Sequence, residues 1–182
     1  MIKNSSLIDF RMPAEWESQD SIWMTWPYNR RDWPGLFKYI PQKVAEILAN
    51  ISKNQKVNLI VKISEDVVIL KRFLKSLDVK IKNVKFYKIQ SNRIWIRDYG
   101  PIYLINKKKG QKVFINFTFN GWSKYKNFHK DNSVNDIISQ ITKIKKIEPK
   151  FKIKKKTKKL ILEGGAIDVN GKGSILLTEE CL

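Results

Sequence analysis

Residues 94–101, with the sequence Ile-Trp-Ile-Arg-Asp-Tyr-Gly-Pro, constrain the fold more than any other segment of the chain. Ile94 and Ile96 alternate with other side chains and predict a strand, which the following glycine and proline end. Arg97 and Asp98 stand next to each other inside this apolar run. Charged side chains are seldom fully buried unless they are paired. Either both charges reach water at the end of a strand, or Asp98 points into a pocket for a cationic ligand, and the segment alone leaves both interpretations open.

The rest of the chain alternates short apolar runs with helical patterns. Val44, Ile47, Leu48 and Ile51 follow the spacing of a helix with one buried face, and Ser64 is placed to cap a second helix over residues 67–77. A third helix is expected from residue 132 or 133 to about 141. Strands are expected at residues 21–26, 57–63, 84–89, 102–105, 113–119, 150–153, 159–163, 166–169 and 174–178.

Length and composition indicate one domain over residues 1–182, with 42% hydrophobic residues available for a core. Stretches of about 18 or more apolar residues are missing from the sequence, so we expect no membrane span. Residues 1–6 lack the apolar core of a signal peptide. Cys181 is the only cysteine, which excludes an internal disulfide framework and fits a reducing, cytoplasmic location.

The formal net charge of +19 raises the possibility of a nucleic-acid-binding protein. Only six of the 36 basic residues are arginines, although specific phosphate and base contacts favour the planar fork of arginine. The lysines are spread through nearly every segment. The densest run, residues 150–159, begins by alternating with apolar residues and is typical of a solvated edge strand. We therefore interpret the lysines as general polar residues of the protein surface, and we expect no nucleic-acid partner.

Four blocks of sequence, taken in order, resemble agmatine deiminases and the related bacterial, Porphyromonas-type peptidyl-arginine deiminases of the pentein superfamily. Residues 94–101 resemble the family signature. The N-terminal block is Met-Pro-Ala-Glu-Trp at 12–16, followed by Trp-Met-Thr-Trp-Pro at 23–27 and Asp-Trp-Pro-Gly at 32–35. The next block is Phe-Asn-Gly-Trp at 119–122, followed by Asp131 and Asn132. The last block is Leu-Glu-Gly-Gly at 162–165, together with residues 177–182.

The resemblance implies an α/β fold, a partial pentein built of strand-strand-helix-strand modules, of which this chain would form about the first half of the ring. It implies a guanidino-group deiminase, a hydrolase that converts agmatine and water to N-carbamoylputrescine and ammonia in putrescine biosynthesis. In such enzymes a cysteine thiolate attacks the guanidinium carbon, ammonia leaves, and water hydrolyses the thiouronium adduct while a histidine moves protons. The resemblance implies no metal and no organic cofactor.

Asp98 and Glu163 are the expected guanidinium-binding carboxylates, because a planar cation is held best by acids that accept paired hydrogen bonds. Gly164 and Gly165 follow Glu163 and would let the backbone approach the ligand. From the residues alone, an exposed acid before an ordinary turn is the simpler interpretation. Within the resemblance, Trp95 and Trp23 would line the substrate pocket, although core packing explains both equally well.

The catalytic histidine and cysteine are not matched. In the family they belong to blocks expected downstream of Leu182, so we expect the 182-residue chain to be inactive by itself. His129 and Cys181 are the only residues of their types, and we do not assign them as a catalytic pair. Arg93 is a further departure, since agmatine-specific members usually carry an acid at this position.

Several alternatives therefore remain open. The substrate is expected to be a small guanidine, with peptidyl arginine or another guanidino compound in place of agmatine as the alternative within the family. A basic nucleic-acid-binding module and a non-catalytic remnant of the fold are alternatives from other classes. A homo-oligomer is possible for the full-length protein, and the sequence does not distinguish a short natural product from a fragment or a shifted reading frame.

Overall fold

The structure, a computed structural model, describes residues 7–154 and 156–181. The expectation that residues 1–6 lack the apolar core of a signal peptide concerns residues outside this range. The chain divides into two compact units. Unit 1 comprises Met1–Glu17, Arg97–Lys126 and Asn132–Leu182, and unit 2 comprises Ser18–Ile96 and Asn127–Asp131. The single domain expected from length stays a prediction.

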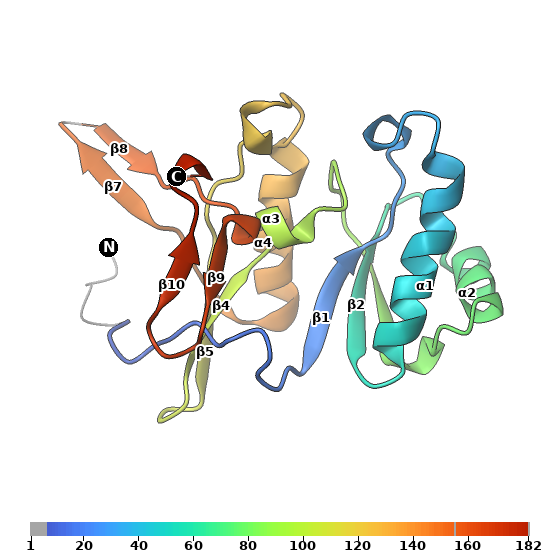
Figure 1. Cartoon of the computed structure of the whole chain (residues 1–182), viewed down its shortest axis with the longest axis horizontal. Coiled ribbons are helices and arrows are strands. Elements are labelled where there is room, and N and C mark those ends of the chain that lie inside the picture. Colours follow the sequence, from blue (N-terminus) through green and yellow to red (C-terminus); the bar gives the residue numbers. More distant parts are fainter. Residues whose placement is uncertain (1–6, 155, 182) are drawn as a thin grey trace. The chain divides into compact units, whose positions relative to one another are not determined.

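Unit 2 contains a parallel three-stranded sheet with two helices. Each strand pairs in parallel with its neighbour in the order β1-β2-β3, so each connection must cross over, and the two helices form these crossovers (Figure 1). The elements of unit 2 are β1 (Ser21–Thr25), α1 (Ile40–Ser52), β2 (Lys56–Val61), α2 (Val67–Ser76) and β3 (Val84–Lys88), with short 3-10 turns at Arg30–Asp32, Phe37–Tyr39 and Ile81–Asn83.

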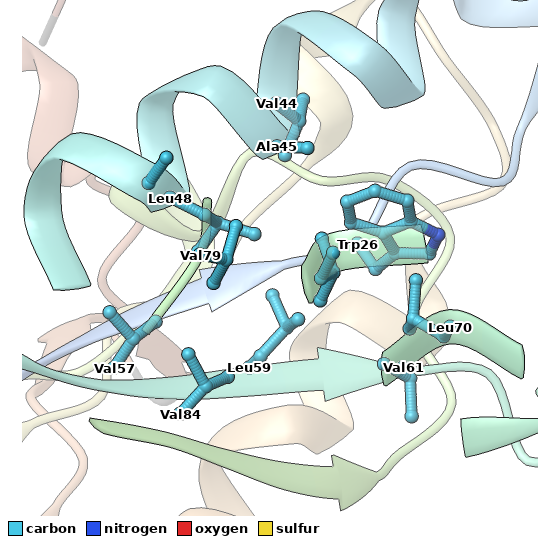
Figure 2. Close-up of a cluster of buried hydrophobic side chains, with 12 residues drawn as sticks. Trp26, Val44, Ala45, Leu48, Val57, Leu59, Val61, Leu70, Val79 and Val84 are labelled. Atoms are coloured by element: carbon cyan, nitrogen blue, oxygen red, sulfur yellow. The ribbon is translucent and has the colours of Figure 1, made fainter. Parts of the chain in front are cut away.

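The core of unit 2 lies between β2 and both helices. Every second residue of β2 faces this core, which both α1 and α2 cover (Figure 2). Two alanines of α1 belong to it, and such small side chains allow the helix to approach the sheet closely. The buried residues of the cluster are Trp26, Val44, Ala45, Leu48, Ala49, Val57, Leu59, Val61, Leu70, Leu74, Val79 and Val84.

Unit 1 contains the strand-strand-helix-strand order expected for a pentein module. β4 and β5 form an antiparallel hairpin, α4 follows, and β6 returns parallel to β5 (Figure 1). Two further antiparallel pairs, β7 with β8 and β9 with β10, complete the unit. The elements are α3 (Ile96–Tyr99), β4 (Ile102–Asn106), β5 (Gln111–Ile115), α4 (His129–Thr142), β6 (Lys145–Ile147), β7 (Lys150–Ile153), β8 (Lys156–Lys159), β9 (Ile167–Val169) and β10 (Ile175–Leu177).

Several local expectations are wrong, among them the start of the third helix at residue 132 or 133, because α4 begins at His129. Within residues 94–101, Ile96–Tyr99 form one helical turn, α3, and no strand is present there. The cap of α2 is Asp66 and not Ser64, because its Oδ1 accepts from the backbone N–H groups of Val68 and Ile69 at 2.9 and 3.1 Å. The strand expected at 159–163 instead lies at Lys156–Lys159, as β8, and Ile161 forms only an isolated bridge with Thr118.

Among the described residues, none of the helices is long and apolar enough to cross a membrane. The basic strands β7 and β8 are exposed along their whole described length. This agrees with the expectation that the lysine-rich run at 150–159 lies at a solvated edge.

Replacement of Leu48 by alanine tests the assignment of the buried face of α1. Leu48 is fully buried, whereas the neighbouring Ile47, which was expected on the same face, is 52% exposed. We expect Leu48→Ala to lower the free energy of unfolding by about 2–5 kcal/mol, because it removes packed methyl groups and leaves a cavity. Ile47→Ala is the matched control and should change it by less than about 0.5 kcal/mol. Urea unfolding measures both, and equal losses would contradict the assigned face.

Candidate active site

The helical turn α3 places Asp98 in unit 1. The proline after Gly100 disfavours further helix, so the turn ends at Tyr99. Tyr99 is 2% exposed and its ring lies 6.0 Å from that of Phe119. The side-chain amide of Asn135, on α4, donates to the Tyr99 carbonyl at 2.8 Å and to Asn116 Oδ1 at 2.7 Å. A buried aromatic ring and a buried amide thus fix the turn that carries Asp98.

The loop after Glu163 lies against this turn without room for side chains. A Cβ at Gly164 would overlap the carbonyl oxygen of Arg97, and a Cβ at Gly165 would overlap Asp98 Oδ1. The glycines are therefore required by close approach. The contact explains the Gly-Gly pair better than the ordinary turn that the sequence also allowed.

Arg97 fastens the same loop from its other side. Its Nε donates to the Gly164 carbonyl at 3.0 Å, and its Nη2 donates to the Ile167 carbonyl at 3.3 Å. Its Nη1 also pairs with Glu15, and both of these side chains are about half exposed. An exposed ion pair contributes little by itself. Arg97 therefore acts mainly through its hydrogen bonds, which hold the loop of Gly164 against the turn of Asp98.

The carboxylate of Asp98 accepts from the backbone N–H of Gly165 and from the indole N–H of Trp122. Partial burial nevertheless raises the pKa of Asp98 above its usual value, against these two hydrogen bonds and the charge of Arg97, which lower it. Trp122 has φ +56° and ψ +28°, a left-handed conformation that is uncommon for a bulky residue and is a mark of local strain. The strain is associated with a side chain that holds a carboxylate.

Glu163 lies close enough to Asp98 for the two charges to interact. Burial raises the pKa of Glu163, and the negative charge of Asp98 raises it further. In the described part of the chain we find no donor to the Glu163 carboxylate. The structure thus brings Asp98, Glu163, Gly164 and Gly165 together, and two partly buried acids side by side are suited to bind a cation.

Trp122 was not recognised as a site residue from the sequence. It belongs to the Phe-Asn-Gly-Trp block, which α4 holds in place: Asn132 Oδ1 accepts from the Phe119 N–H at 2.9 Å, and Asn132 Nδ2 donates to the Phe119 carbonyl at 2.6 Å. The indole ring packs edge-on against Phe119 at 4.9 Å. A signal was present, because this block is one of the four that carry the family resemblance.

The two tryptophans proposed for substrate binding lie in unit 2. Trp95 is 41% exposed, and its ring is 5.9 Å from that of Trp33. Trp23, on β1, packs 5.0 Å from Tyr87 on the sheet. Packing accounts for Trp23, whereas Trp95 has an accessible side chain. Their roles in substrate binding stay predictions.

His129 and Cys181 are both exposed. His129 is the first residue of α4, and its ring lies 4.7 Å from Phe128. Cys181 is in the 3-10 turn Glu179–Cys181. Within the described ranges we also find no group of three His, Cys, Asp or Glu side chains that could hold a metal ion.

Arg93, which departs from the family pattern, belongs to a buried polar cluster in unit 2. Arg93 is 3% exposed and donates from Nη1 to the Asn127 carbonyl and from Nη2 to Asn127 Oδ1, both at 2.8 Å, while its Nε lies 3.5 Å from Asp32 Oδ1. Asp131 Oδ1 accepts from the backbone N–H groups of Asn92 and Arg93 at 2.5 and 3.2 Å. Burial, the largest influence, raises the pKa of Asp131 to about 6 despite these bonds and the charge of Arg93.

Comparison with known proteins identifies the family of this chain. The sequence model of the Porphyromonas-type peptidyl-arginine deiminases matches residues 11–182. The chain belongs to this family.

Relatives within the deiminase family include the agmatine deiminase of Pseudomonas savastanoi pv. phaseolicola, which is 31% identical over 175 residues. That alignment covers 95% of this chain and 44% of the relative. The agmatine deiminase of Enterococcus faecalis is similar in structure, with a TM-score of 0.76, 27% identity, and coverage of 96% of this chain and 45% of that one. A substrate-bound agmatine deiminase of C. jejuni gives a TM-score of 0.73 with 31% identity, and coverage of 95% and 46%.

These matches confirm the expected fold class, a partial pentein that corresponds to an N-terminal portion of the deiminase fold. The chain spans a little under half the length of the family members it matches. One expectation about the modules needs correction, because unit 2 runs strand-helix-strand-helix-strand and only unit 1 contains the strand-strand-helix-strand order.

Trp122→Phe tests whether the indole N–H stabilises ionised Asp98. Loss of this donor should raise the pKa of Asp98 further, because a hydrogen bond to the charged form favours that form. NMR titration of the Asp98 carboxyl carbon measures the shift. Trp16→Phe is the control, since Trp16 is also in unit 1 but is 74% exposed. An Asp98 pKa that stays the same in Trp122→Phe would contradict the assigned contact.

Asp131→Asn tests the cost of burying an acid beside the backbone of residues 92 and 93. The pKa of Asp131 is raised to about 6 from 3.8, so the folded state binds its proton more tightly than the unfolded state does. The contribution of this group to the free energy of unfolding should therefore fall as the pH rises from about 4 to about 6. The difference between the wild type and Asp131→Asn isolates that slope in urea unfolding. Parallel pH profiles of the two proteins would contradict it.

Proposed function

We propose that this chain contributes the guanidinium-binding part of an agmatine deiminase, which converts agmatine and water to N-carbamoylputrescine and ammonia on the way to putrescine. The observation that carries the proposal is the pair of partly buried acids, Asp98 and Glu163, at a loop with no room for side chains. The family match supports the reaction type. The proposal extends to a cytoplasmic location and, for the full-length enzyme, to a homo-oligomer.

In this proposal Asp98 and Glu163 hold the guanidinium. Burial raises the pKa of both acids, and the charge of Asp98 raises the pKa of Glu163 further. The ionised form of each acid would therefore be stabilised when a cation enters the site. A guanidinium offers planar pairs of N–H donors, and charge-assisted bonds to carboxylates are about twice as strong as neutral ones. Binding by carboxylates also localises the positive charge of the guanidinium, which favours nucleophilic attack at its central carbon.

The other proposed substrate-binding residues are Gly164, Gly165, Trp95 and Trp23. The absence of a Cβ at the two glycines lets the backbone approach both the carboxylates and a ligand. The accessible indole of Trp95 offers an aromatic face to a cation. Trp23 has the weakest support, because its packing on Tyr87 explains it without a ligand.

The covalent step follows from the family resemblance. A thiolate forms a bond to the guanidinium carbon and ammonia leaves with a proton supplied by a histidine; water then breaks the carbon–sulfur bond, and the urea product and the thiol are released. We assign neither His129 nor Cys181 to these roles. The residues of this chain bind and orient the guanidinium in the proposal, and they do not supply the nucleophile.

Agmatine is favoured over peptidyl arginine by the relatives, and the environment of Arg93 does not oppose it. The named relatives and the substrate-bound structure are agmatine deiminases. In addition, the Arg93 side chain is buried, binds Asn127 twice and lies beside Asp32, so its charge is balanced within unit 2. An exposed arginine would repel the second positive charge of agmatine, whereas a buried and paired one does so much less. The basic residue at this position therefore does not argue against agmatine.

Calorimetric titration of the 182-residue chain with agmatine tests the site. We expect weak binding that Asp98→Asn and Glu163→Gln each reduce by roughly tenfold or more, since hydrogen bonds to charged groups contribute about 1.5–3 kcal/mol. Asp168→Asn and Glu180→Gln are matched controls, because both acids are exposed and lie in the same unit. Equal losses in all four variants would indicate general attraction between charges and contradict the site.

Competing ligands separate the candidate functions. Putrescine lacks the guanidinium and should bind much more weakly than agmatine, while tighter binding of N-acetyl-arginine amide would favour a peptidyl substrate. We expect no release of ammonia from agmatine by this chain or by its Cys181→Ala variant. Turnover that disappears in Cys181→Ala would show that Cys181 is the nucleophile and overturn its exclusion from the mechanism.

A further inference from the structure

A cavity of about 570 Å³ lies at the carboxyl edge of the parallel sheet in unit 2. Its wall is formed by residues that follow each of the three strands, namely Tyr28 after β1, Lys62 after β2 and Ser91 after β3. In open α/β sheets, ligands bind in the crevice outside the carboxyl ends of the strands. The cavity therefore lies at the end of the sheet at which open α/β folds bind ligands, although the order β1-β2-β3 contains no reversal of strand order.

The wall of this cavity is basic. Arg31, Lys62 and Lys130 contribute to it, and its described lining contains neither aspartate nor glutamate. Two acids that are adjacent in sequence to lining residues, Asp32 and Asp131, have buried side chains and engage Arg93 and the backbone beside it. Three cations on a concave surface create a positive potential that selects anionic ligands.

One buried group in the wall lacks a partner. Ser91 is 6% exposed, and within the described residues its hydroxyl finds no hydrogen-bond partner. A buried polar group without a partner costs about 1–3 kcal/mol, and a bound water or ligand is one of the explanations for such a group in a native structure. A hydroxyl is a donor as well as an acceptor, so an oxyanion in the cavity would satisfy it.

The polar wall is held in place by bonds within unit 2. Asn92 Oδ1 accepts from the backbone N–H of Lys130 at 2.9 Å, and the side-chain amide of Asn29 donates to Asp32 Oδ1 at 3.0 Å. The hydroxyl of Tyr28 donates to the Ser91 carbonyl, and the ammonium of Lys62 lies over the Tyr28 ring at 5.2 Å. These contacts fix the position of the cavity wall before any ligand enters.

We propose that this cavity binds a small molecule through an oxyanion of the phosphate type. Arg31, Lys62 and Lys130 would balance its charge, and the Ser91 hydroxyl would donate to one of its oxygens. Three cations exceed what a single carboxylate requires, which favours the more highly charged phosphate group. The inference uses residues of unit 2 alone and does not depend on the proposed deiminase function.

NMR titration of the 182-residue chain with inorganic phosphate at constant ionic strength tests the proposal. We expect saturable shifts of the backbone amides of Ser91, Asn92 and Lys130. The triple variant Arg31→Ala, Lys62→Ala, Lys130→Ala should weaken binding at least tenfold. Ser91→Ala should weaken it several-fold without lowering the thermal stability, because the hydroxyl has no partner to lose.

A second triple variant controls for the overall charge of the protein. Lys56→Ala, Arg72→Ala, Lys75→Ala removes the same charge from exposed positions of unit 2 outside the cavity. If both triple variants weaken phosphate binding equally, attraction to a basic protein explains the binding and the site is overturned. Acetate that binds as tightly as phosphate would overturn the assignment of a phosphate group. The phosphate titration does not depend on the agmatine titration, so a failure to bind agmatine would neither support nor overturn the phosphate site.

Discussion

The close approach of the loop at Gly164 and Gly165 to the turn α3 is the contact on which the candidate active site depends. A side chain at either glycine would overlap the backbone of Arg97 or the carboxylate of Asp98. The same approach lets the Gly165 N–H reach Asp98 and lets Arg97 donate to two carbonyls of the loop. Two segments that lie 67 residues apart in sequence thus become one surface, and the side-chain bonds add direction to a contact that shape alone already permits.

This arrangement is costly in the absence of a ligand. Burial raises the pKa of both Asp98 and Glu163, and their like charges oppose each other. Structural ion pairs normally match an acid with a base, whereas the nearest base, Arg97, directs its donors to backbone carbonyls and to Glu15. Acids whose pKa values are raised in this way cluster at functional sites. In the proposed function, a bound guanidinium would reverse the sign of this local electrostatic interaction and would give the site a preference for cations that an exposed pair of acids would lack.

Much of the fold could be predicted because hydrophobic periodicity reports burial directly. The strands β1, β2 and β3 and the helix α1 follow from their apolar patterns, and the site residues Asp98 and Glu163 were selected by the resemblance. The strand expected at residues 94–101 was wrong because Tyr99 and its carbonyl are fixed by Phe119 and Asn135, which come from later in the chain. Ile47 fits the helical period but is exposed, since alanines occupy the face nearest the sheet. The bond from Trp122 to Asp98 depends on a left-handed backbone conformation, which the sequence does not reveal.

Arg93 shows why a change of residue type is not by itself a change of specificity. From the sequence, a base in place of the usual acid suggests that the substrate differs. In the structure this guanidinium is 97% enclosed: it is 3% exposed, forms two bonds to Asn127 and lies beside Asp32. A buried arginine requires such partners, because an isolated charge in the interior is strongly unfavourable. The acids beside it, Asp32 and Asp131, are absent from the described lining of the cavity, which contains Arg31, Lys62 and Lys130. Under the two proposals, a buried and paired Arg93 is compatible with a cation site in unit 1 and an anion site in unit 2.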